Sequence, residues 1–284
     1  MKMLLALAAH ILSFIGYAQP ADKDSSANCV TNWKVGETKT YSIIHEKSTI
    51  DESGNNAPFR FEYQALISVL DATPYTYTIK WVFQLPDEYK TMHPRFAESL
   101  PVFDGMQMIF TTSEMGTFLE LVNWEEVRDT YIRQMEISLP KKMDSTAKAT
   151  LAATKKMFDS KQTVESTLIK EIQLFHLPYG YQFTTTEAGA DTKLPNPFGG
   201  KPFPARQTYR LTDLDKAKDS FTLVFQLKID KGSLHNMGTS YDLQDYTEYR
   251  FINSSGWISR LFYKRTVLIE KTRQLESYSI ELKD

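Results

Sequence analysis

Histidines are the residues best suited to metal binding or to proton transfer near neutral pH. Four of them follow the first twenty residues: His45, His93, His176 and His235. None has a second histidine or a cysteine at the spacing of a zinc site. His176 lies at the end of a helical pattern, between two apolar residues, which favours a half-buried histidine with a hydrogen-bond partner over a metal ligand. The sequence therefore predicts no metal site and no cofactor.

Two groups of carboxylates could supply the acid and base pair of a glycosidase. Glu125 and Glu126 open a predicted helix, where negative charge is favourable in itself. Asp242, Asp245 and Glu248 fall in one predicted strand, in which Asp242 and Glu248 share a face and Asp245 lies on the other. We expect a solvated sheet face for all three. A hydrolase with dispersed carboxylates remains an alternative, and no catalytic residue is assigned.

The motifs of serine catalysis and of phosphate binding are not found in the sequence. No Gly-x-Ser-x-Gly segment is present to hold a serine nucleophile on a sharp turn. The segment 199–201 (GGK) is similar to part of a phosphate-binding loop, but the flanking Pro197 and Pro202 exclude the strand–loop–helix setting that such a loop needs. Neither feature predicts an enzyme.

Large apolar side chains form a more informative pattern. Two predicted strands each carry five of them at every second position, so that the five share one face. The sets are Tyr75, Tyr77, Ile79, Trp81 and Phe83, and Phe221, Leu223, Phe225, Leu227 and Ile229. Burial of such faces is the main source of stability, so a filled core is one interpretation. A curved sheet that leaves part of this wall facing a cavity would instead bind an apolar ligand.

The ligand interpretation assigns wall residues to both strands and to the helix expected beside them. The strands would supply contacts along the wall, and the helix would close it. The ligand-binding residues expected on this basis are Tyr77, Trp81, Phe83, Trp124, Tyr131, Phe225 and Leu227.

Alternation of apolar and polar residues predicts a β-rich chain of antiparallel strands. The first half contains a meander and a hairpin, with strands at 38–49, 59–70, 75–83, 106–112 and 117–122. A loop rich in glycine and proline covers 186–204 and is expected to join rather than to pack. The strands of the second half follow at 207–211, 221–229, 241–252, 257–269 and 272–282.

A helical block separates the two β-rich halves. Asn123 can cap a helix over 124–139, with Glu126 three residues later in a capping-box arrangement. Apolar residues at helical spacing continue over 142–159 and 164–175. We expect this block, at about 123–176, to cover one face or end of the sheet; a mobile lid over a ligand cleft is the alternative.

Charge and cysteine content limit the class of partner and the source of stability. The net charge is −2, so the chain lacks the basic field that nucleic acid requires, and no nucleic-acid partner is expected. Cys29 is the single cysteine, so the fold must hold together without an internal disulfide. We expect an unpaired thiol in a flexible leader, with lipid attachment or pairing between chains as alternatives.

The first eighteen residues have the layout of a secretory signal peptide. A cationic start at Lys2 precedes an apolar run over 4–15, and small residues lead to cleavage after Ala18. The run falls short of the roughly 20 residues of a membrane span, and no later segment comes close. We expect an exported protein of the periplasm, cell surface or medium, without a transmembrane span in the mature chain. A flexible leader over 19–32 would precede a single β-rich domain over 33–284.

Two segments carry a resemblance to known proteins. They are 33–41 (WKVGETKTY), which precedes the meander, and 194–205 (LPNPFGGKPFPA), which precedes a later strand. In these segments the chain resembles uncharacterised exported proteins of Bacteroidetes-like bacteria. Its general layout is similar to the LolA-like group of envelope proteins, in which an antiparallel half-barrel wraps around helices. The resemblance supplies no catalytic residues.

The sequence thus predicts an α+β fold with a large, curved antiparallel sheet, a half-barrel-like meander, and a central helical block packed on one face or end. The function indicated is non-enzymatic: binding of an apolar or amphipathic ligand, such as a lipid, on the concave sheet surface. A structural or protein-interaction module of the cell envelope, with an envelope protein as partner, is the second hypothesis. A hydrolase is the third.

Overall fold

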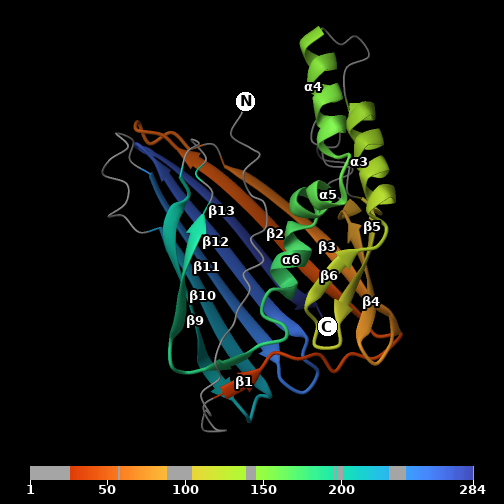
Figure 1. Cartoon of the computed structure of the whole chain (residues 1–284), viewed down its shortest axis with the longest axis vertical. Helices are drawn as coiled ribbons and strands as arrows, with labels where there is room; N and C mark the ends of the chain where they lie inside the picture. The colour runs from red at the N-terminus through yellow and green to blue at the C-terminus, as the bar shows by residue number, and fades with distance from the viewer. Residues whose placement is uncertain are drawn as a thin grey trace. The chain divides into compact units, whose positions relative to one another are not determined.

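The computed structural model describes residues 26–56, 58–87, 104–138, 145–194, 196, 201–229 and 241–283. Over these residues the chain forms antiparallel strands and four helices, which confirms the predicted α+β class (Figure 1). Eleven strands follow one another in a single sheet, in the order β6-β5-β4-β3-β2-β13-β12-β11-β10-β9-β8. Most neighbours in this order are also consecutive in the sequence, as the predicted meander requires.

The chain divides into two compact units. Unit 1 comprises Met1–Trp33, Ser42–Phe61 and Gly180–Leu282, and unit 2 comprises Lys34–Tyr41, Glu62–Tyr179 and Lys283–Asp284. The predicted signal peptide, together with His93 and His235, lies outside the described residues. The single domain predicted over 33–284 stays a prediction. The strand order joins eleven strands in one sheet, whereas the contacts divide the chain into two units.

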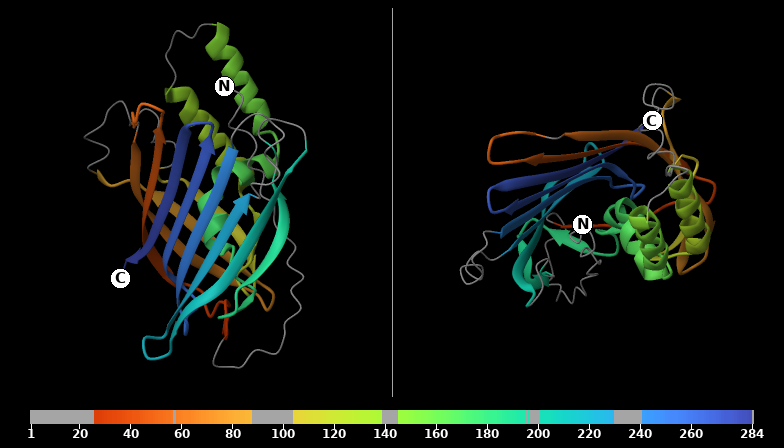
Figure 2. Two further views of the ribbon diagram at one scale, coloured as in Figure 1. Left: turned by 90° about the vertical axis from the view of Figure 1, so that its left-hand side faces the viewer. Right: turned by 90° about the horizontal axis from the view of Figure 1, so that it is seen from above.

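Unit 1 is built mainly from long antiparallel strands. Their bounds are β8 (Ala188–Leu194), β9 (Phe203–Asp215), β10 (Ser220–Ile229), β11 (Tyr241–Ile252), β12 (Ile258–Ile269) and β13 (Thr272–Lys283), with most of β2 (Thr38–Ile50). Aromatic side chains fill one face, where Phe221 and Phe251 stack at 4.7 Å and Phe225 meets Tyr249 edge to face at 5.5 Å. Figure 2 shows these strands side by side.

Strand β8 of unit 1 differs from the prediction. The segment predicted as a joining loop, 186–204, contains β8, whose register pairs Ala188 with Tyr209 and Leu194 with Phe203. Its residues are small, polar and mostly exposed, so the strand has no alternating apolar signal. It exists because β9 is longer than predicted and offers a backbone edge for pairing.

The predicted flexible leader over 19–32 differs from the structure in its described part. Strand β1 (Ser26–Asn28) pairs with β7 (Gln182–Thr184), and Cys29 exchanges backbone hydrogen bonds with Tyr181 and Gly180 at 2.9 and 2.8 Å. The Cys29 side chain is fully buried, which raises the pKa of its thiol. Cys29 is therefore part of an ordered segment, and its lipid attachment or pairing between chains stays a prediction.

The N-terminal segment of unit 1 also docks on the turn between β11 and β12. Trp33 stacks on Trp257 with ring centroids 4.6 Å apart, and both rings are buried. Asn32 donates from its backbone N–H to Ser255 O at 3.2 Å. Gly256 has a φ of +71°, and a Cβ there would lie 2.1 Å from the carbonyl oxygen of Val30. Only glycine therefore allows this close approach.

Unit 2 contains most of the second strand and all of the third strand of the predicted meander, the hairpin and the helical block. Its strands are β3 (Phe59–Ala72), β4 (Thr76–Gln84), β5 (Gln107–Ser113) and β6 (Phe118–Leu121). Unit 2 includes β3 from Glu62 onward. Strict alternation on β3 buries one face, with Tyr63, Ala65, Ile67 and Val69 turned inward. This is the period-two pattern that the sequence displays.

The helical block forms four helices in unit 2. They are α3 (Trp124–Ser138), α4 (Ser145–Met157), α5 (Lys161–Leu168) and α6 (Lys170–His176). The side chain of Asn123, the predicted cap of α3, connects the start of the helix to the sheet. Its Oδ1 accepts the N–H of Ile109 on β5 at 2.8 Å. Its amide nitrogen donates to Glu126 at 3.1 Å. Phe175 of α6 meets Trp81 of β4 at 5.7 Å, so the block packs on the sheet as predicted.

Candidate functional site

The seven predicted ligand-binding residues are divided between the two units. Five belong to β4 and α3 of unit 2, and the other two, Phe225 and Leu227, belong to β10 of unit 1. The two groups lie in different units, and the ligand role of all seven residues stays a prediction.

On β4 the predicted wall residues line the buried face of unit 2. Trp81 and Phe83 are buried, and Tyr77 is half-buried. Trp81 meets Phe175 edge to face, while Phe83 lies 5.2 Å from Tyr63. These contacts place aromatic rings of the protein against both residues. The Trp81 indole N–H is buried without a hydrogen-bond partner among the described residues.

The two predicted helix residues lie half-buried on α3. Trp124 has the guanidinium of Arg128 over its ring at 5.1 Å, a cation–π contact within one helical turn. Tyr131 packs against Phe158 at 5.1 Å. Both residues therefore contact side chains of the helical block itself.

His176 is the most deeply buried histidine of the described residues. Because a carbonyl oxygen can only accept, Nδ1 must carry the proton that it donates to Gly116 O at 2.8 Å. Burial lowers the pKa of His176 to about 4, against the opposing effect of that hydrogen bond. The neutral imidazole thus belongs to the packing of unit 2 and is fully buried, whereas the sequence predicted a half-buried histidine.

The burial of His176 predicts a pH-dependent stability. Between pH 6.5 and about 4 the unfolded chain binds a proton at His176 that the folded chain lacks. This contribution is therefore complete above pH 6.5 and is lost as the pH falls, by about 3 kcal/mol at pH 4. H176N keeps a donor for Gly116 and should lose this slope in urea unfolding at pH 7 and 4.5. An unchanged difference between the two pH values would contradict the assignment.

In unit 1, the apolar face of the sheet continues beyond Phe225 into a separate cluster. Phe225 packs on Phe183 and Tyr209 at 5.4 and 6.0 Å. Leu227 is half-buried and packs against the cluster that lies further along the strands. We call this group the apolar cluster; it consists of Phe203, Ala205, Ile229, Tyr241 and Leu243.

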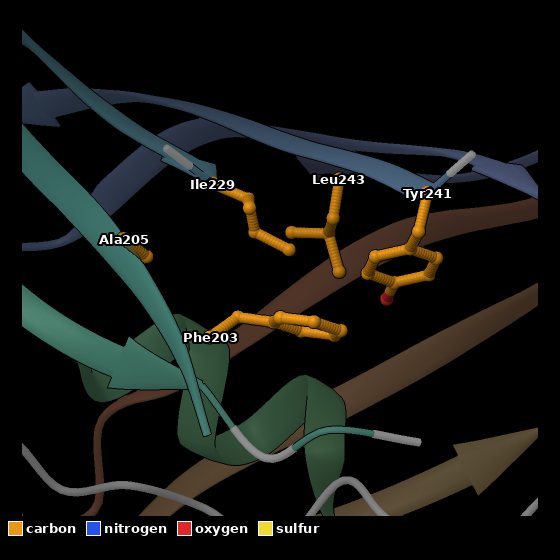
Figure 3. Close-up of a cluster of buried hydrophobic side chains, with 5 residues drawn as sticks. All are labelled: Phe203, Ala205, Ile229, Tyr241 and Leu243. Atoms are coloured by element: carbon orange, nitrogen blue, oxygen red, sulfur yellow. The ribbon is translucent and has the colours of Figure 1, made fainter. Parts of the chain in front are cut away.

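The apolar cluster draws its side chains from β9, β10 and β11, and they point toward one another (Figure 3). The rings of Phe203 and Tyr241 stack at 5.2 Å, and Ile229 and Leu243 reach toward them. Half-buried Val267 and Ile269 on β12 extend the same surface. The cluster gives this end of the sheet a buried apolar core.

A row of charged side chains crosses the same face between Phe225 and the apolar cluster. Asp245 stands opposite Arg265 in the register of β11 and β12, and Arg265 stands opposite Glu276 on β13. Arg265 binds Asp245 through two nitrogens, with Nε 2.7 Å from Oδ1. Glu276 accepts from His45 at 3.1 Å and pairs with Lys47 at 3.2 Å. We call these five residues the charged row.

The charged row is mostly withdrawn from solvent. The side chains of Asp245 and Arg265 are 11% and 16% exposed. Burial acts to lower the pKa of the Arg265 guanidinium, but the hydrogen bond and the charge of Asp245 outweigh it and raise the pKa overall. Such a pair is costly to desolvate and stays favourable only while both partners are present.

The charged row corrects the expectation that Asp242, Asp245 and Glu248 lie on one kind of solvated surface. The faces of these residues were predicted correctly, since Asp245 and Glu248 lie on opposite faces of β11. Glu248 accepts a hydrogen bond from the Tyr246 hydroxyl at 2.8 Å. Burial of Asp245 was not predicted. The available signal was Arg265, a charged residue at a position that the register of β12 turns to the same face as Asp245.

The described residues hold no group of three or more histidine, cysteine or carboxylate side chains that could bind a metal ion. No helix in the described part of the chain is long and apolar enough to cross a membrane. In unit 1 the described residues place a buried apolar cluster beside paired charges of both signs.

Comparison with known proteins yields structural matches alone. No family model and no curated protein matches the chain. It is similar to a protein designated as exported, with a YmcC-like fold, from Bacteroides fragilis NCTC 9343, at 10% identity over 90% of this chain and 99% of that one, with a TM-score of 0.25. A protein designated as a lipoprotein, from Parabacteroides distasonis ATCC 8503, matches at 8% identity over 90% and 100%, with a TM-score of 0.27.

A third match is the COG4313 outer membrane channel from Pseudomonas putida F1, at 8% identity over 94% of this chain and 100% of that one, with a TM-score of 0.17. The first two matches confirm the predicted resemblance to exported proteins of Bacteroidetes-like bacteria. At these TM-scores none of the three carries an argument about ligand, partner or mechanism.

Proposed function

We propose that this chain is a non-enzymatic, exported envelope protein that binds an amphipathic ligand on the apolar face of the unit 1 sheet. The observation that supports this proposal is the charged row, which lies directly beside the apolar cluster on a face that also carries the buried polar residues Gln207 and Thr247. Export rests on the signal peptide predicted over residues 1–18.

The cost of the charged row is the reason to assign it a function. A well-packed apolar substitute for a buried ion pair is often as stable or more stable, so stability alone does not explain Asp245 and Arg265. A ligand with a polar head would use both signs of charge offered there, while its hydrocarbon part would lie along Leu227 and the apolar cluster. Phe225 would form the floor on the other side of the row.

The proposal assigns different roles to the predicted wall residues. Phe225 and Leu227 would contact the ligand in unit 1. The predicted residues of unit 2 would form an apolar wall within that unit, where Trp81 is the residue of interest because its buried N–H is available to a polar group. The first group is tested first, since it adjoins the charges that would bind a head group.

The test is whether lipid accompanies the protein and leaves when the charged row is removed. Protein purified from its own envelope should carry lipid in native mass spectrometry and in solvent extraction. The double variant D245M/R265M leaves no unpaired charge and should lower the affinity for a fluorescent fatty acid by about tenfold. The exposed cross-strand pair of Arg206 and Asp191 supplies the matched control, R206M/D191M, which should bind the probe as wild type does.

Two results would count against a ligand-binding function. One is protein that carries no lipid and does not bind the probe at micromolar concentrations, which would favour the interaction module. The other is equal probe affinity in wild type and D245M/R265M, which would separate binding from the charged row.

A further inference from the structure

Exposed apolar side chains gather at one end of the unit 2 strands. They lie on the loop before β2, at the end of β3, on the β3–β4 and β5–β6 turns and after α6. We call them the apolar tip; its members are Val35, Leu70, Tyr75, Met115 and Leu177. Tyr75 is 76% exposed, far more than is usual for a tyrosine beside a buried strand face.

Strand register and backbone hydrogen bonds place these side chains together. Thr76 pairs with Ser113, so the β3–β4 and β5–β6 turns lie at the same end of the sheet (Figure 1). The N–H of Glu114 donates to Tyr75 O at 2.8 Å, which joins one turn to the other. The turns are therefore held in place, and the apolar tip is preorganised.

Two further hydrogen bonds attach the outer members of the apolar tip. Gly36, next to Val35, donates its N–H to Val69 O at 2.9 Å, beside Leu70. His176, which precedes Leu177, donates to the carbonyl of Gly116, which follows Met115. All five side chains thus project from a single connected set of loops.

The charges around the apolar tip limit what it can bind. The loops 34–37, 70–76 and 113–117 contain one basic residue, Lys34, and three acidic residues: Glu37, Asp71 and Glu114. The net negative charge of these loops would repel an anionic surface. A partner must therefore be apolar and without net negative charge.

We propose that the apolar tip inserts into the interfacial region of a zwitterionic phospholipid bilayer. A bilayer accepts separate apolar side chains on convex turns, whereas a stable protein interface needs a continuous surface of about 800 Å² on each partner. Tyrosine suits the membrane interface because its ring is apolar and its hydroxyl is polar. Unlike ligand binding in unit 1, this contact holds the protein at a membrane surface.

The experiment is flotation of the full exported chain with phosphatidylcholine vesicles. We expect wild type to float, and Y75D/M115D to lower the partition coefficient by about tenfold or more, because two charged groups would have to leave water. Ile137 on α3 is 71% exposed and lies outside the apolar tip, so I137D is the matched control and should float as wild type does. Adding phosphatidylglycerol should not increase binding.

A second variant keeps the test independent of stability. Y75W places an indole on the tip, and its emission should shift to the blue on addition of phosphatidylcholine vesicles and be quenched by brominated acyl chains. Wild type that stays unbound, or Y75D/M115D that floats equally well, would overturn the proposal. So would a dimer in lipid-free solution that Y75D/M115D abolishes, because the occupant of the tip would then be a second copy of the chain.

Discussion

Replacing Gly256 by alanine should lower the free energy of unfolding by about 4 kcal/mol. The φ of +71° at this position strains any residue with a Cβ, and that Cβ would lie 2.1 Å from the carbonyl oxygen of Val30 and 3.0 Å from Thr31 Cα. Both contacts are to backbone, so no side-chain rotation relieves them. The N-terminal segment would have to leave the β11–β12 turn. Urea unfolding followed by circular dichroism measures the change.

Gly54 provides a matched control for this effect. Its φ is +80°, similar to that of Gly256, but a Cβ there would meet nothing within 4 Å. The variant G54A should therefore cost about 1 kcal/mol, the price of the backbone conformation alone. Equal losses in the two variants would show that close packing of the N-terminal segment contributes nothing to stability.

Replacing Arg265 by methionine should cost about 3 to 5 kcal/mol, the second large effect. The substitution leaves the Asp245 carboxylate on a buried face without its bidentate partner. The loss comes chiefly from the uncompensated charge rather than from the pair itself. The double variant D245M/R265M should consequently recover most of the stability that R265M loses.

The exposed pair of Arg206 and Asp191 is the matched control, because it shows the effect of losing an ion pair without burial. It also joins neighbouring strands, β8 and β9, but its side chains are 64% and 86% exposed. R206M should change the free energy of unfolding by less than about 1 kcal/mol. If R265M proved as mild as R206M, the charged row would have to be better solvated than its exposure indicates, and its role in ligand binding would weaken accordingly.

Much of the fold could be predicted from period-two patterns. Alternation on β4 and β10 indicated the inward faces, and Trp81, Phe83 and Phe225 are buried as the filled-core interpretation expects. The helix over 124–139 was predicted from its capping residues and matches α3 closely. These features are local, because each depends on residues a few positions apart.

The remainder depends on residues far apart in the sequence. Strand β1 is three residues long and pairs with β7, so no local pattern distinguishes it from a flexible leader. The charged row is likewise visible only once Asp245 and Arg265 are in register. Of the candidate site, the alternation of β10 predicted that Phe225 and Leu227 share a face, but no local pattern predicted the charges beside them.

Unit 1 is assembled from three segments that are far apart in the sequence, so its parts are synthesised at different times. Asn32 and Ser254, which are hydrogen-bonded, lie 222 positions apart. At a synthesis rate of about 5 to 20 residues per second, the nascent chain carries its first tryptophan for roughly ten to forty seconds before the partner ring emerges. Throughout that interval Trp33 has no sheet to cover it. The contact between the two tryptophans can form only after the turn between β11 and β12 has been synthesised.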